Sequence, residues 1–336
     1  MSATPYPLIL EPIFETAAEE VPQTPPLFDD FCQRHRLAPP ADRPASQLWL
    51  LCDAPGRQSI VANGPWAGRQ LRELVESQPQ ELIGRDHSGE KPFPLCVRVF
   101  ATARQQPLLV HPDEEAPADL YKRHGSMKFW YSLAVERGAR AFVGLHPRAS
   151  LQQLFGQLNT PDARRFLQKF QVREGDSCLI PPGVVHSLSA GHLTWEMQPR
   201  AVSPLRLCDG GDHHEIPPEE QQAARQSLKM ESRQSMRTAK VRGSLTHTRK
   251  ISLTPHWPYF SVEEIRIADH IFLETDGRQF QLLYTIAGAV AIQYRNSETV
   301  ELPPGRVCCL PAKLGSFKLT APDTAEVLRA GPLASL

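Results

Sequence analysis

Two histidines in this chain of 336 residues stand in sequence patterns that can position a metal ion. His186 lies near the end of the segment GDSCLIPPGVVHSL, in which five residues separate Gly175 from Pro181, and Gly183 stands three residues before the histidine. Glycines allow a tight turn and prolines end a strand, so the imidazole is expected to point into a small β-barrel. Imidazole is a common metal ligand that works with two or three further side chains. The segment LVHPD supplies a second histidine, His111.

The overall composition favours a small-molecule partner. The chain has 37 Lys and Arg against 37 Asp and Glu, a formal net charge of zero, so its charge balance indicates neither nucleic acid nor an anionic membrane as partner. Seven cysteines without framework spacing are typical of a reduced, cytoplasmic protein. No stretch approaches the roughly 20 apolar residues of a membrane span. We therefore expect a cytoplasmic protein that acts on a small molecule.

The secondary structure expected from the pattern is mostly strand. With 32 prolines, 20 glycines and 7% aromatic residues, the composition suits short strands and tight turns. YPLILEPIF indicates an opening pair of strands, residues 69–82 have helical spacing, and residues 149–170 predict a small insertion of two short helices, the second carrying Phe166 and Phe170. Four further strands are expected in FPLCVRVFA, PLLVHPD, KFWYSLAV and RAFVGLH.

A second copy of the hairpin pattern lies 130 positions further along the chain. Gly305 and Pro311 repeat the spacing of Gly175 and Pro181, and the position that matches His186 is Ser316. A chance match in a proline-rich chain is the alternative. The repeat predicts an N-terminal domain over residues 1–208 that holds the site, a partly helical connector over 209–250, and a C-terminal barrel without metal ligands over 251–336.

The connector carries basic residues at helical spacing. Arg225, Lys229, Arg233 and Arg237 fall four apart and would line one face of a helix. An anion-binding surface and an ordinary solvated face both fit this pattern. The pattern assigns the connector no function.

Segments spread over most of the chain resemble the type I mannose-6-phosphate isomerases, especially their short bacterial form. The hairpin ending in His186 is similar to the second signature hairpin of cupin barrels. The other matching segments are YPLILEPIF, VANGPWAGRQLRELV, FPLCVRVF, VHPDE, the spacing of Gly125 to Trp130 and Tyr131, and Trp195 to Arg206. The resemblance implies a mostly β fold of two cupin barrels, of the double-stranded β-helix or jelly-roll kind. It also implies a zinc-dependent aldose–ketose isomerase that interconverts mannose 6-phosphate and fructose 6-phosphate through a cis-enediol.

The resemblance assigns metal ligands to the two histidines but replaces two other ligands. His111 and His186 match family zinc ligands, whereas Leu109 stands where the family has glutamine and Lys128 where it has glutamate. Both changes remove lone pairs that zinc needs, and two histidines are fewer than the three protein ligands of most catalytic zinc sites. The resemblance thus implies zinc as cofactor, with binding that is weak or absent.

Other positions match the family's substrate-handling groups. Glu196, ten residues after His186, matches a proton-transfer base, and Arg206 matches the active-site arginine. Arg98 replaces a lysine and keeps positive charge for a phosphate, and Lys128 could bind a hydroxyl or polarise a carbonyl. An ordinary ion pair is the alternative role for Glu196 and Arg206.

Two functions therefore remain open at this stage. One is mannose-6-phosphate isomerase, and the other is a non-catalytic or altered cupin that binds a sugar phosphate. The partner in both cases is a small sugar phosphate, with no nucleic acid and no membrane, and the oligomeric state is not predicted.

Overall fold

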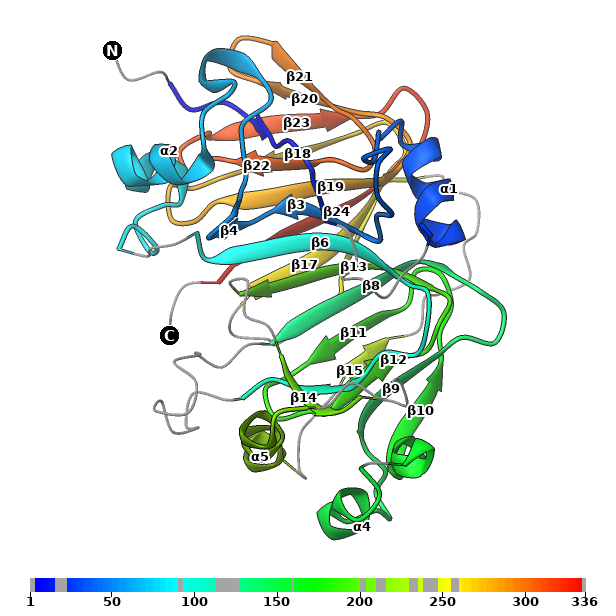
Figure 1. Cartoon of the computed structure of the whole chain (residues 1–336). Coiled ribbons are helices and arrows are strands. Elements are labelled where there is room, and N and C mark those ends of the chain that lie inside the picture. Colours follow the sequence, from blue (N-terminus) through cyan, green and yellow to red (C-terminus); the bar gives the residue numbers. More distant parts are fainter. Residues whose placement is uncertain are drawn as a thin grey trace.

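Two β-barrels stacked on each other make up most of the structure (Figure 1). It is a computed structural model that describes residues 4–15, 23–89, 93–112, 127–158, 160–199, 204–209, 216–229, 235–237, 247–254 and 260–333. The prediction of a mostly β chain with two cupin barrels is confirmed. Within these ranges, no helix combines the length and the apolar character needed to cross a bilayer.

The N-terminal barrel pairs two antiparallel sheets, with strands counted over the described residues. The seven-stranded sheet has the order β15 (Ser235–Arg237), β11 (Ser177–Ile180), β8 (Lys128–Val135), β13 (His192–Pro199), β6 (Leu95–Thr102), β3 (Gln47–Leu51) and β2 (Ile13–Glu15). The five-stranded sheet has the order β10 (Leu167–Gln171), β9 (Arg140–Leu145), β12 (His186–Leu188), β7 (Leu108–Val110) and β14 (Leu205–Cys208). The four strands expected between residues 93 and 146 correspond to β6, β7, β8 and β9, so this part of the sequence-based prediction is confirmed.

The C-terminal barrel also consists of two sheets over the described residues. The larger sheet has the order β1 (Leu8–Ile9), β22 (Val307–Leu310), β19 (Gln281–Ala287), β24 (Ala325–Pro332), β17 (Phe260–Ile267) and β16 (Arg249–Ser252). The smaller sheet has the order β18 (His270–Glu274), β23 (Ser316–Thr320), β20 (Val290–Tyr294) and β21 (Glu298–Leu302). A short two-stranded sheet of its own is formed by β4 (Asp53–Ala54) and β5 (Arg57–Gln58).

The first strand of the chain belongs to the C-terminal barrel. In Figure 1 the dark blue β1 lies among the orange and red strands, because Leu8 pairs with Cys309 and Ile9 with Cys308. The expected opening strand pair is therefore wrong in its pairing: β1 and β2 both form, but β2 pairs with β3 in the other barrel. The domain boundaries at residues 208 and 250 stay a prediction.

The helices lie at the edges of the two barrels (Figure 1). Their bounds are α1 (Pro26–Arg34), the 3-10 helix η1 (Gly64–Trp66), α2 (Leu71–Ser77), α3 (Pro79–Leu82), α4 (Leu151–Phe155), the 3-10 helix η2 (Pro161–Phe166) and α5 (Pro218–Ser227). The helical spacing of residues 69–82 is confirmed as α2 and α3, which are separated at Gln78 because Pro79 starts a new turn.

Two expected helices end earlier than their spacing predicts. The second helix of the insertion is the single 3-10 segment η2, and Phe170 lies in strand β10 because its backbone pairs with Ala141. In the connector, α5 ends at Ser227, so Lys229 lies beyond it and Arg237 lies in β15. Arg233 lies outside the described residues. One helical face carrying all four basic residues is therefore wrong.

The two hairpins that repeat in sequence also repeat in structure. Gly175 and Gly305 both adopt a positive φ, of 83° and 75°, a conformation that favours glycine. In the first hairpin the amide of Val184 donates to the carbonyl of Pro181, and in the second the amide of Leu314 donates to that of Pro311. These bonds are related by the same shift of 130 residues, so the repeat is structural and not a chance match.

The sheets that face each other between the barrels share one apolar core. Trp195 on β13 and Tyr284 on β19 pack with ring centres 6.0 Å apart. The hydroxyl of Tyr131 donates across the same interface to Glu264, at 3.1 Å. One face of the seven-stranded sheet is consequently fixed against the C-terminal barrel, and its other face lines the N-terminal barrel.

Candidate functional site

A row of polar side chains crosses the inner face of the seven-stranded sheet. Residues directly opposite each other on antiparallel strands point to the same face, and Arg98, Glu196 and Trp130 are opposite each other on β6, β13 and β8. Lys128 stands two residues before Trp130 on β8 and therefore faces the same way. Trp130 packs with residues of the opposite sheet, among them Val143, so this face is the barrel interior.

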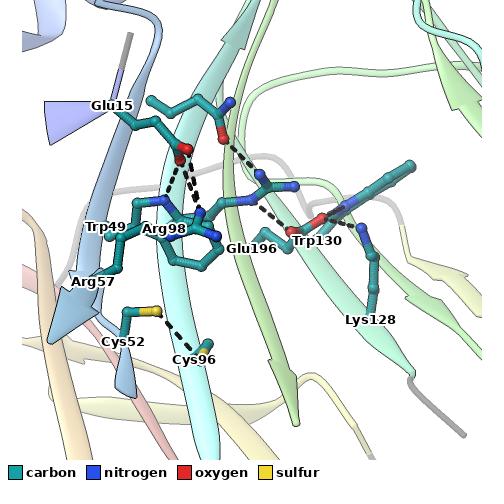
Figure 2. A network of polar contacts seen from close by, with 10 residues as sticks. Glu15, Trp49, Cys52, Arg57, Cys96, Arg98, Lys128, Trp130 and Glu196 are labelled. Carbon is teal, nitrogen blue, oxygen red and sulfur yellow. Dashed lines mark hydrogen bonds and ion pairs between the residues drawn. The ribbon is translucent and has the colours of Figure 1, made fainter. Parts of the chain in front are cut away.

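The carboxylate of Glu196 is the centre of this row (Figure 2). It accepts hydrogen bonds from Nε of Arg98 at 2.7 Å and from Nε1 of Trp130 at 2.8 Å. The ammonium of Lys128 lies 3.1 Å from its second oxygen. Burial alone raises the pKa of Glu196, but the charges of Arg98 and Lys128 and these hydrogen bonds lower it to about 2. A carboxylate held this firmly in its ionised form is a weak base.

Lys128 is almost completely buried, with a side chain only 2% exposed. Burial lowers the pKa of its ammonium, and the charge of Arg98 lowers it further, while the attraction of Glu196 raises it. The structure therefore places Lys128 in the interior of the barrel and not at the surface. Its partner there is the carboxylate of Glu196.

Arg98 is held from several sides. Its Nη1 donates to Oε1 of Gln47 at 2.5 Å, and its guanidinium carbon lies 5.2 Å and 4.8 Å from the ring centres of Trp49 and Phe100. Cation–π contact with two rings and two hydrogen bonds fix the plane of the guanidinium. The side chain of Arg98 remains 20% exposed, so part of its guanidinium is accessible to solvent.

The opposite sheet of the barrel carries the two histidines. The rings of His111 and His186 are stacked, with centres 5.7 Å apart and planes 7° from parallel, and Trp130 meets His186 edge-on at 5.4 Å. Nδ1 of His186 lies 2.9 Å from the carbonyl of Val184, whereas its buried Nε2 has no hydrogen-bond partner among the described residues. Burial and the charge of Lys128 lower the pKa of His186 to about 3. The imidazole is therefore neutral at pH 7.

Arg206 lies on the same face of the five-stranded sheet as His186, but its guanidinium contacts helix α5. Leu109 is opposite His186 on one side and Arg206 on the other, so these three residues form a row. The guanidinium of Arg206 binds the carboxylate of Glu220 on α5 at 3.0 Å, and its side chain is 36% exposed. No contact between Arg206 and Glu196 is found among the described residues, so they do not form the ion pair considered as an alternative.

Several residues of this network have no signal in the sequence. Gln47, which accepts from Arg98, lies 51 residues away from it in the sequence. Glu15 accepts a hydrogen bond from the indole of Trp49 at 2.6 Å and lies 34 residues before that tryptophan. Nη1 of Arg57 lies 3.0 Å from the same carboxylate of Glu15 and so adds a further cation to the network. Only the register between β2, β3 and β6 brings these side chains together, and spacing along the chain does not report it.

Comparison with known proteins gives consistent matches. The family profile described as "Mannose-6-phosphate isomerase, cupin domain" matches residues 251–330. A Bacillus subtilis protein named probable mannose-6-phosphate isomerase GmuF is 28% identical over 207 residues, which cover 61% of this chain and 61% of that protein. The mannose-6-phosphate isomerase of Streptococcus mutans is 27% identical over 163 residues, 48% of this chain and 50% of that protein. The alignments thus span only about half to three fifths of these relatives.

A solved structure extends the comparison of the fold to nearly the whole chain. The crystal structure of mannose 6-phosphate isomerase from Bacillus subtilis covers 96% of this chain and 99% of its own, with a TM-score of 0.78 and 21% identity. The chain is thus similar in sequence to the mannose-6-phosphate isomerases over about half to three fifths of its length, and similar to them in fold over nearly all of it. A phosphomannose isomerase variant from Salmonella typhimurium has the same fold, with a TM-score of 0.77 and 12% identity over 98% of this chain.

The side chains at the position where the resemblance implies a zinc ion do not fit that ion. Among the described residues at this position, His111 and His186 are the two usual zinc ligands, whereas Leu109 has no lone pair and the amine of Lys128 is engaged by the carboxylate of Glu196 at 3.1 Å. Among the described residues, no group of three His, Cys, Asp or Glu is placed to hold a metal. Moreover, the carboxylate of Glu196 is already bound by Arg98, Trp130 and Lys128, so it does not offer a free ligand oxygen to a divalent cation.

Proposed function

We propose that this protein binds a sugar phosphate inside its N-terminal barrel without a resident zinc ion, and does not carry out zinc-assisted isomerisation. The observation that carries the proposal is the buried contact of Lys128 with Glu196 at 3.1 Å. An ammonium stands where the resemblance implies a glutamate ligand, and it uses the carboxylate that the resemblance implies as the base. One ion pair thereby occupies both the position of a zinc ligand and the carboxylate that would act as the base.

The charge of the barrel interior supports an anionic ligand. A phosphate monoester carries close to two negative charges at pH 7, and arginine binds it with two parallel hydrogen bonds. Arg98 is partly exposed and fixed in plane by Trp49 and Phe100, and it is the first candidate for the phosphate. Arg206, which lies in the row with Leu109 and His186, is the second. The neutral imidazole of His186 suits a sugar hydroxyl.

A binding experiment tests this proposal directly. Fructose 6-phosphate is titrated calorimetrically into the protein in the presence of a chelator, with fructose as the matched ligand that lacks the phosphate. We expect binding of the phosphate ester alone, unaffected by the chelator. Arg98→Gln and Arg206→Ala should each weaken it about 10- to 100-fold, the loss of a charge-assisted hydrogen bond. Arg329→Gln, in the other barrel, is the control and should leave the affinity unchanged.

Mannose-6-phosphate isomerase activity is the second candidate function. A relative from Streptococcus mutans carries that name, and the resemblance to this family includes the segment Trp195 to Arg206. An assay of fructose 6-phosphate formation with and without added zinc separates the two functions. Turnover that requires zinc would overturn the proposal, whereas turnover that ignores zinc would indicate an altered, metal-independent isomerase. A cytoplasmic location and the absence of nucleic acid and membrane partners remain part of the proposal.

A further inference from the structure

Two thiols approach each other at the edge of the charged row. Sγ of Cys96 lies 3.9 Å from Sγ of Cys52, and the thiol of Cys96 donates to that of Cys52 (Figure 2). Both side chains are buried, in a small cluster with Trp49, Ala54 and Ile13. A sulfur pair at this distance needs a movement of about 2 Å to reach the length of a disulfide bond.

The strand register places the two residues opposite each other. Leu51 at the end of β3 pairs with Val97 on β6, so the next position on each strand holds Cys52 and Cys96. Residues that face each other across antiparallel strands have Cβ atoms about 4.5 to 5.5 Å apart, roughly 1 Å more than in disulfides, so closing the bond requires a small approach of the two strands. The backbone of Cys52 is held on the other side by Ser59, whose amide donates to the Cys52 carbonyl at 2.9 Å. The approach of the sulfurs is therefore fixed by two strands.

The two thiols differ in acidity in the sense that oxidation requires. The hydrogen bond from Cys96 lowers the pKa of Cys52, burial opposes this, and the charge of Arg57 adds to the lowering. The pKa of Cys96 is raised by its hydrogen bond to Cys52 and by burial. Because the Cys52 sulfur accepts the hydrogen bond from Cys96, we assign Cys52 as the nucleophile and Cys96 as the resolving thiol.

We infer that Cys52 and Cys96 form a reversible intramolecular disulfide when the protein meets a hydroperoxide. Cys52 loses its thiol proton and its sulfur attacks one peroxide oxygen, the O–O bond breaks, and the leaving hydroxide takes up that proton, so that a sulfenic acid and one water form. The Cys96 sulfur then attacks the Cys52 sulfur, the S–O bond breaks, and a second water leaves as the disulfide forms. Two thiols and one hydrogen peroxide give one disulfide and two waters. This site is separate from the proposed sugar-phosphate function.

Hydrogen peroxide treatment of the folded protein, followed by mass spectrometry without reduction, tests the inference. We expect a loss of two hydrogens per chain, a crosslink between the peptides that contain Cys52 and Cys96, and reversal by dithiothreitol. The oxidised form should melt several degrees higher, because the bond closes the chain over residues 53–95. Since both thiols are buried, the reaction should take longer than for an exposed thiol.

Matched variants make the result specific. Cys52→Ser and Cys96→Ala should each abolish the crosslink, while Cys178→Ser, a change at another buried thiol, should leave it intact. The wild-type peptide map decides the matter even if a variant does not fold. A folded wild-type protein that keeps both thiols free, or that links other cysteines instead, would overturn the inference.

Discussion

The two barrels of this chain place opposite charges at the same position of the fold. The strands β11 and β22 are related by the shift of 130 residues, and the equivalent positions follow across the paired strands. In the N-terminal barrel this path from β11 leads over β8 to Glu196, and in the C-terminal barrel the path from β22 leads over β19 to Arg329. The place of Arg98 is likewise taken by Glu263. Both pairs form ion pairs, Arg98 with Glu196 at 2.7 Å and Arg329 with Glu263 at 2.6 Å.

Burial makes these two ion pairs differ in kind. The side chain of Glu196 is 1% exposed, whereas that of Glu263 is 26% exposed, so water screens part of the charge of Glu263. The residues that surround the first pair are replaced as well: Gln281 stands at the place of Lys128, and Leu283 at that of Trp130. The same backbone thus supports a buried charged network in one barrel and ordinary packing in the other. The charged interior of the N-terminal barrel is the difference on which the proposed binding site rests.

The largest expected difference between the barrels follows from removing one carboxylate from each. Glu196→Gln leaves Lys128 and Arg98 facing an uncharged amide in a buried place, which should cost about 3 to 5 kcal/mol of unfolding free energy. The matched variant Glu263→Gln removes a partly exposed pair and should cost about 0 to 1 kcal/mol. Urea unfolding at pH 7 measures both. Equal losses would mean that the two pairs play the same structural part.

Acid should destabilise the N-terminal barrel through His186. The pKa of its imidazole is about 3 in the folded chain against an ordinary value of 6.5, so between these values only the unfolded chain takes up the proton. Folded stability is therefore present in full above pH 6.5 and is lost as the pH falls toward 3. Glu196 adds a further loss as the pH falls from 4.5 to about 2.

The variant His186→Gln isolates this contribution. Unfolding free energies at pH 7 and pH 4.5 should differ less in the variant than in the parent. Part of the dependence should remain, because burial also lowers the pKa of His35 and of His192 to about 4. An unchanged difference between the two pH values would show that His186 is not the buried neutral group described here.

The smallest expected effect comes from giving the C-terminal hairpin the missing histidine. Ser316 is exposed at the start of β23, so Ser316→His should change the unfolding free energy by less than about 0.5 kcal/mol. It should not create a zinc site, because Gln281 and Leu283 surround the corresponding position in place of ligands. Zinc titration of the variant checks this. Tight zinc binding would mean that the hairpin alone determines a metal site in this fold.

The sequence predicts the barrels well because their signals are local. Glycine at Gly175 and Gly305 and the following prolines determine turn geometry, and the alternation within each strand determines which face is buried. Pairings between distant segments were not accessible in this way. β1 joins the C-terminal barrel across some 300 residues, and Phe170 enters a strand because β9 offers it a partner.

The sequence predicted which residues belong to the candidate site better than it predicted which of them contact each other. The resemblance named Lys128, Glu196 and Arg98 separately, but only the register of three strands joins them in one network. It paired Arg206 in function with Glu196, whereas the structure places Arg206 against Glu220. Gln47 was missed because amide side chains at strand starts carry no pattern of their own.

Zinc content tests the central claim, that the Lys128–Glu196 ion pair occupies the place of the metal. The wild-type protein and the double variant Leu109→Gln with Lys128→Glu are dialysed against zinc and then against a mild chelator, and bound zinc is measured per chain. We predict well under one zinc for the wild type and a higher content for the double variant, which regains an amide and a carboxylate ligand. Stoichiometric zinc retained by the wild-type chain would contradict the account.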